Sequence, residues 1–103
     1  MAYEILWTKE ALSNLEGILD YLQTKWTQRE VNNFKNKLSS LINLIGQRPL
    51  LFPKSSYRED LHKAVLSKQT SIFYLVKKNQ IHLVFIFDNR MDTKKIEKRQ
   101  PNN

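Results

Sequence analysis

Histidine is the side chain best suited to proton transfer near neutral pH, and this chain has two, His62 and His82. The chain as a whole is basic: its 103 residues include 17 Lys and Arg against 10 Asp and Glu, which gives a net charge of +7. Residues 1–50 carry 6 basic and 5 acidic side chains, whereas residues 51–103 carry 11 and 5. The second half is therefore expected to present a surface to a polyanion or an acidic protein, the alternative being charge that serves only solubility.

The composition excludes several kinds of site. The chain has no cysteine, so neither a disulfide framework nor a thiolate zinc site can hold it together, and two histidines are too few for a histidine-only metal cage. We therefore expect no cofactor and no metal. The length and the 41% hydrophobic content predict one domain over residues 1–103, with residues 91–103 as a polar basic tail. No apolar run approaches the roughly 20 residues of a membrane span, which predicts a cytoplasmic protein.

The first half of the chain has the pattern of a strand and two helices. Residues 3–7 (YEILW) are typical of a strand. Thr8 is a suitable N-cap for a helix over residues 10–25, where apolar side chains recur at steps of three and four. Residues 27–30 (TQRE) match a capping box, so a second helix follows at once and forms a tight hairpin with the first.

The second helix is predicted to run through residues 31–45. Gly46 stands where a left-handed C-cap would be placed, and Pro49 prevents continuation. Residues 51–60 contain a proline and have no apolar period, which indicates a connecting loop.

Three strands are predicted after this loop, at residues 62–67, 71–77 and 81–88, because these segments are rich in Val, Ile, Leu, Phe and Tyr. Short polar turns separate them, so neighbours should pair as an antiparallel meander. The last strand is nearly all apolar, and we expect it to be central and covered on both faces. The fold class is α+β: a helical hairpin on one face of a small, mostly antiparallel four-stranded sheet, in the order β-α-α-β-β-β. The opposite face is then available for function.

This order, with several short motifs, resembles the RelE/ParE superfamily of type II toxins from about Tyr3 to Ile96. Each motif is short and hydrophobic, so the resemblance lies in their order and spacing. The motifs are WTKEAL after the first strand, DYL at 20–22, LINLIGQRPLLFPKS at 41–55, IFYLV at 72–76, and DNR at 88–90 followed by Asp92.

The resemblance implies a plasmid-stabilisation toxin that arrests bacterial growth and is neutralised by a cognate antitoxin, usually an acidic, partly disordered protein. The net charge of +7 fits such a partner. It also implies one of two activities: ParE-like members poison DNA gyrase, and RelE-like members cleave messenger RNA on the ribosome. The fold alone cannot choose between them, so whether the chain is an enzyme stays open.

Cleavage of RNA through its 2′-hydroxyl needs basic side chains directed at one phosphate. By resemblance, Lys63 and Arg90 occupy positions where the nucleases often carry a functional lysine and arginine. Ser71 stands near the place of a further arginine, and Ile96 near the place of a tyrosine. Neither substitute can do the same chemistry. These departures favour the ParE-like branch, or a nuclease with a rearranged site that uses His62 or His82.

Each candidate also has a plainer interpretation. His62 would then be a solvated strand end, and His82 an edge or core residue on one strand face with Val84, Ile86 and Asp88. Arg90 and Asp88 have the same strand parity, so a structural ion pair is the alternative to contact with a target.

Other basic residues are candidates for binding a target or nucleic acid. Arg58, with Lys54, would rim the functional surface, and Lys68 joins Lys63 and Arg90 as a target contact, although strand-end and turn lysines often only protect sheet edges. The large aromatic residues fall on apolar periods and are expected in the core and at caps rather than stacked on bases. These are Trp7, Trp26, Phe34, Tyr74 and Phe85.

The favoured function is a ParE-like toxin that acts on DNA gyrase and pairs with an antitoxin, without a membrane partner. The alternatives are a ribosome-dependent mRNA endonuclease, a non-enzymatic nucleic-acid-binding module, and a degenerate toxin that binds its antitoxin only for regulation.

Overall fold

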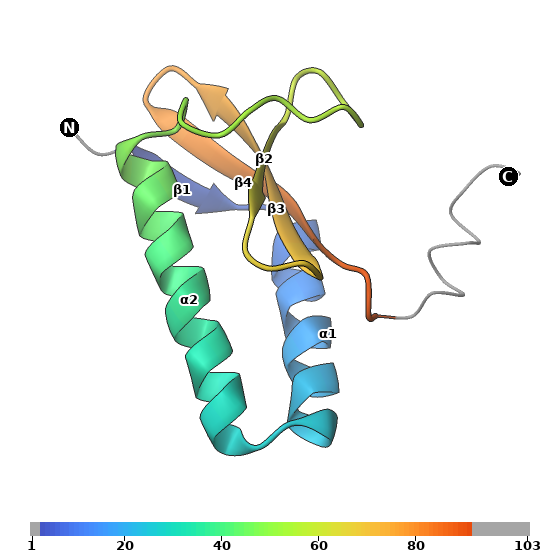
Figure 1. Ribbon diagram of the computed structural model, residues 1–103. Coiled ribbons are helices and arrows are strands. Elements are labelled where there is room, and N and C mark those ends of the chain that lie inside the picture. The colour runs from blue at the N-terminus through green and yellow to red at the C-terminus, as the bar shows by residue number, and fades with distance from the viewer. Residues whose placement is uncertain (1–2, 92–103) are drawn as a thin grey trace, which may run out of the picture.

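A four-stranded sheet with two helices on one face makes up the computed structural model, which describes residues 3–91 (Figure 1). The elements are β1 (Glu4–Trp7), α1 (Lys9–Lys25), α2 (Gln28–Gln47), β2 (His62–Val65), β3 (Thr70–Lys77) and β4 (Gln80–Asp88). The sheet order is β1-β4-β3-β2; β1 pairs parallel to β4, and the other pairs are antiparallel. The predicted α+β class and element order are confirmed. The tail from Asp92 onward, which includes Ile96, lies outside the described residues.

Two threonine caps define the helical hairpin as predicted. The Thr8 hydroxyl accepts from the Ala11 amide at 3.0 Å and donates to the Val84 carbonyl at 2.7 Å, which ties the start of α1 to β4. At the start of α2, the Thr27 hydroxyl accepts from the Glu30 amide, and the Glu30 carboxylate accepts from the Thr27 amide. This reciprocal box satisfies two helix-end donors and separates the helices by a single turn.

The end of α2 differs from the prediction. Gly46 is helical rather than left-handed, and α2 continues to Gln47. It ends there because Pro49 disfavours helical geometry at Arg48, whose φ and ψ are −139° and 69°. Gly46 is buried where α2 meets the start of the chain, and its carbonyl accepts from the Tyr3 amide at 2.9 Å. A Cβ there would lie 3.4 Å from the Ile5 side chain, so the glycine permits close approach.

The core fills the space between the helices and the sheet face that they cover. Tyr74 is fully buried there and donates its hydroxyl to the Pro49 carbonyl at 2.6 Å, which fastens the segment after α2 to the sheet. Burial raises the pKa of this phenol to about 12. The other buried core residues are Ala11, Ile18, Leu22, Val31, Phe34, Leu38, Ile45, Ala64, Ile72, Ile81, Leu83 and Ile86. Within residues 3–91, neither helix has the length and apolarity needed to cross a membrane.

A bulge in β4 decides which of its side chains face the helices. Phe73 pairs with Phe85 and Tyr74 with Leu83, so Val84 has no partner in β3. Beyond this extra residue the alternation reverses, and Ile86 joins Leu83 in the core.

The prediction that His82 shares a face with Ile86 and Asp88 is therefore wrong, because the bulge separates them. The prediction that β4 is central is confirmed. Its second face is not covered, however, since Phe87 is 38% exposed.

Candidate functional site

The sheet face turned away from the helices is the candidate functional site, and we call it the open sheet face. Strand register places its side chains in rows that cross the strands. The rows are Val65, Ser71 and Phe87; Lys63, Phe73 and Phe85; Leu75, His82 and Leu6; and Lys77, Gln80 and Glu4. The first three rows are mainly apolar, with Lys63 on the edge strand β2, and the last row is polar.

An aromatic cluster occupies the middle of the open sheet face. The rings of Phe73 and Phe85 stack with their centroids 4.4 Å apart at an interplanar angle of 18°. Tyr57, from the loop before β2, lies 6.3 Å from the first ring and 6.0 Å from the second, at 69° and 85°. Because it is nearly equidistant from both, Tyr57 spans their shared edge. It is 71% exposed, so it presents an aromatic ring to solvent.

Lys63 adds a positive charge to this cluster. Its Nζ lies 5.9 Å from the Phe73 ring centroid, within range of a cation–π interaction. The side chain is exposed, and within residues 3–91 no carboxylate lies within the 4.0 Å of an ion pair. The ammonium group is therefore available to a partner.

His62 lies on the other side of the sheet from Lys63. Its ring is 7% exposed, stacks on Tyr74 with centroids 5.2 Å apart, and has Nδ1 2.8 Å from the Phe52 carbonyl oxygen. The interpretation as a solvated strand end is wrong, because the loop before β2 covers the ring. His62 is held in a structural contact away from the open sheet face.

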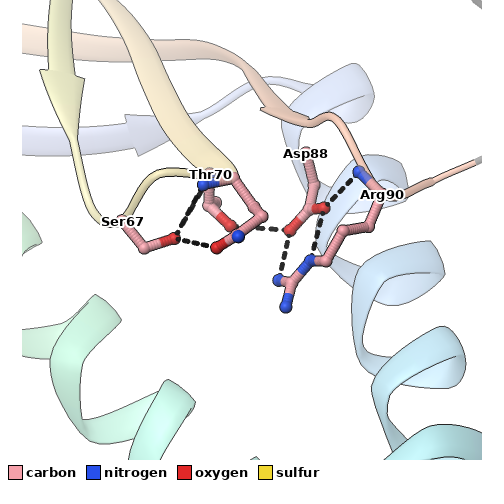
Figure 2. Close-up of polar contacts among 5 residues, drawn as sticks. Ser67, Thr70, Asp88 and Arg90 are labelled. Atoms are coloured by element: carbon pink, nitrogen blue, oxygen red, sulfur yellow. Dashed lines mark hydrogen bonds and ion pairs between the residues drawn. The ribbon is translucent and has the colours of Figure 1, made fainter.

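Arg90 belongs to a polar cluster at the end of β4, shown in Figure 2. Its guanidinium donates to both carboxylate oxygens of Asp88 at 3.0 and 2.7 Å, and its backbone N–H donates to the same group at 2.9 Å. Thr70 donates its hydroxyl to the carboxylate at 2.6 Å. The guanidinium carbon also lies 4.9 Å from the Trp26 ring centroid, at the end of α1.

The electrostatics of this cluster follow from its geometry. Burial of the Asp88 carboxyl acts to raise its pKa, but the hydrogen bonds from Arg90 and Thr70 outweigh burial and hold the pKa below its usual value. The hydrogen bond to Asp88 raises the pKa of Arg90 in turn. The predicted structural ion pair is present, and the guanidinium is directed toward α1. Lys63 and Arg90 are therefore not brought together in one site.

The remaining predicted contacts are scattered. Arg58 forms an ion pair with Asp60 at 2.8 Å, and both side chains are about half exposed, at 48% and 52%. Hydrogen bonding within this pair raises the pKa of Arg58 and lowers that of Asp60. Lys68 is exposed in the turn between β2 and β3. Ser71 lies on the open sheet face, so the position where the nucleases often carry an arginine has no cation.

Two hollows of about 460 and 400 Å³ lie at the turn after β3 and between α2 and the end of β2, where Val65 lines the second. Neither hollow is lined by Lys63, His62 or Arg90. In the described part of the chain, no group of three or more His, Asp or Glu could hold a metal ion. The open sheet face can bury apolar surface against a partner and present Lys63 to it. It does not bring several cations close enough to bind one phosphate.

The aromatic cluster was missed from the sequence. Phe85 was expected in the core, but it stacks on Phe73 outside the core. The alternation of Lys63 with buried neighbours in β2 was a usable signal for Lys63. No pattern in the sequence indicated that Tyr57 would join the cluster, because its position depends on how a loop folds back over the sheet.

Comparison with known proteins gives a consistent result. The family model of the ParE toxin of the type II toxin–antitoxin system parDE matches residues 5–93. The chromosomal ParDE system from P. aeruginosa has a similar structure, with a TM-score of 0.72 and 16% identity, covering 84% of this chain and 96% of that one. The YoeB/ParE toxin from Agrobacterium tumefaciens has a TM-score of 0.61 and 11% identity, covering 82% and 96%.

The RelBE2 toxin–antitoxin complex from Mycobacterium tuberculosis matches with a TM-score of 0.58 and 14% identity, covering 85% of this chain and 99% of that one. A search of curated proteins found no match. At these identities the structural matches show a shared fold, which both toxin branches use.

Proposed function

Because the chain belongs to the ParE toxin family of type II toxin–antitoxin systems, we propose that it arrests bacterial growth by binding DNA gyrase and is neutralised by a cognate antitoxin. The family membership rests on a match over residues 5–93. The choice of gyrase rests on the site, as follows.

The separation of Lys63 and Arg90 is the observation that carries the gyrase proposal. A nuclease must neutralise a pentavalent phosphate and move protons at two oxygens, so its basic groups must converge within hydrogen-bond reach of one phosphate. Here Arg90 is bound to Asp88 beside α1, and Lys63 lies on the open sheet face. His62 is buried against Tyr74. A toxin that works by binding a protein needs none of these groups to converge.

The charge of the chain supports an antitoxin partner. A net charge of +7 favours association with an acidic protein and raises the rate of encounter. The similar RelBE2 structure is itself a toxin–antitoxin complex. We expect the antitoxin gene beside this one, and expression of this protein alone should stop growth that co-expression of the neighbour restores.

A gyrase assay tests the proposed target. Purified protein added to gyrase, relaxed plasmid and ATP should inhibit supercoiling, and addition of the neighbouring gene product should restore it. In parallel, primer extension on a ribosome-bound message should show no cleavage. Normal supercoiling together with cleavage of the message would refute the gyrase proposal.

The mRNA endonuclease stays as the second candidate because Lys63 is exposed and forms no ion pair within residues 3–91, at a position where nuclease members often carry a functional lysine. If the message is cut in the assay above, Lys63→Ala should abolish cleavage and leave antitoxin binding intact. Undiminished cleavage by this variant would exclude Lys63 from the site.

A further inference from the structure

We propose that the open sheet face is the surface that docks on gyrase: its aromatic and aliphatic side chains cover an apolar patch of the target, and Lys63 pairs with a target carboxylate. This rests on the proposed function and adds the surface and its chemistry.

Exposed apolar side chains gather on this face. Tyr57 is 71% exposed, Val65 58% and Phe87 38%. Strand register puts Val65 and Phe87 in one row on either side of Ser71, and Tyr57 lies over the next row. Several exposed apolar side chains on one face of a small domain are typical of an interaction site.

The central rings of this face are packed against one another before binding. Phe73 and Phe85 stack, and Tyr57 contacts both rings. A partner that docks on fixed aromatic rings loses little side-chain entropy, and aromatic residues supply much of the energy of protein interfaces.

The charges favour a protein partner over a nucleic acid. Binding to a phosphate backbone depends on several cations that each neutralise a phosphate. Lys63 and Lys77 are the lysines that strand register assigns to this face within the described residues. The nearby Arg58 is paired with Asp60, and Arg90 with Asp88. Within residues 3–91 neither of these two lysines forms an ion pair, and Lys63 borders the aromatic rings. An ammonium group beside apolar side chains is complementary to an apolar surface that carries a carboxylate.

Three variants of the full chain test the proposal, each compared with wild type for inhibition of gyrase supercoiling. Tyr57→Ser and Val65→Ser remove apolar surface, and Lys63→Glu reverses the charge. All three side chains are exposed, so the fold should persist, which thermal unfolding followed by circular dichroism can check. We expect each to raise the concentration needed for half inhibition about tenfold, the effect of losing one interface hot spot.

Matched controls come from the helical layer. Leu12→Ser removes a leucine that is 47% exposed on α1, and Lys35→Glu reverses an exposed lysine on α2. Both should inhibit gyrase like wild type. If the three face variants also inhibit like wild type, the docking surface is wrong while the proposed function stands. If wild type itself does not inhibit gyrase, the proposed function fails and the docking proposal fails with it.

Other occupants of the face would give their own results. Sedimentation showing that Val65→Ser converts a dimer to a monomer, with gyrase inhibition unchanged, would assign the face to a second copy of the chain. Salt-sensitive binding of a labelled single-stranded oligonucleotide, lost in Lys63→Glu while gyrase inhibition is retained, would assign it to nucleic acid. Either result overturns the proposal.

Discussion

Replacing Arg90 by alanine should lower the free energy of unfolding more than replacing any other arginine of the described residues. Asp88 is 3% exposed in the wild type, and Arg90→Ala removes two charge-assisted hydrogen bonds from its carboxylate. It keeps the donors from the Thr70 hydroxyl and the backbone N–H of residue 90. The variant also loses the contact with the Trp26 ring.

The magnitude follows from these losses. Breaking a buried ion pair by removing one partner costs about 3–5 kcal/mol. The Arg90 side chain is 22% exposed, so water can reach part of the vacated space, and two donors remain on Asp88. We therefore expect the free energy of unfolding to fall by about 2–4 kcal/mol, a large share of the about 5–15 kcal/mol available to a small domain.

Urea unfolding at pH 7 measures this change. Arg58→Ala is the matched control: it also breaks a two-bond arginine–aspartate pair, but on the exposed surface, and should leave the unfolding midpoint unchanged. If Arg90→Ala has the same midpoint as wild type, then the Asp88 cluster does not stabilise the fold and its geometry has been misinterpreted.

Further predictions concern the pH dependence and two structural contacts. The folded-state pKa of Asp88 is depressed, so its contribution to stability is present above the unfolded pKa of about 4 and is lost as pH falls through the folded value. The Arg90→Ala cost should therefore be largest at pH 7 and shrink in urea titrations as the pH falls, because burial then acts on Asp88 without the Arg90 donors; a cost at pH 2 equal to that at pH 7 would contradict the pKa direction. Tyr74→Phe leaves the Pro49 carbonyl without its 2.6 Å donor and should cost about 1–2 kcal/mol by urea unfolding, whereas no change would mean that water replaces the phenol. Thr27→Ala removes a cap and should cost about 1 kcal/mol by the same measurement, with Thr27→Ser as the control that restores it.

The local elements of this protein were predictable from its sequence. Helix starts at Thr8 and Thr27 followed from cap chemistry, because hydroxyl and carboxylate side chains satisfy amide groups within three residues in the chain. The meander of β2, β3 and β4 followed from apolar runs between short turns. The class and order of the fold then followed, since an amphipathic hairpin must cover one face of the sheet. These inferences depend on interactions between residues close in sequence or on simple periodicity.

The arrangement of the candidate site was decided by tertiary structure. The extra residue Val84 in β4 reverses the alternation, so strand parity counted from the sequence wrongly grouped His82 with Ile86 and Asp88. The loop before β2 buries His62 and sets Tyr57 across the Phe73 and Phe85 rings, and no local pattern encodes where that loop folds.

Arg90 and Lys63 illustrate the same limit. The resemblance to the toxin superfamily implied two cations at one phosphate, but the buried Asp88 carboxylate holds Arg90 beside α1 while Lys63 lies on the open sheet face. A sequence determines which charges are present. Which charges pair is decided by burial, because a carboxylate removed from water binds the cation that its surroundings bring within reach.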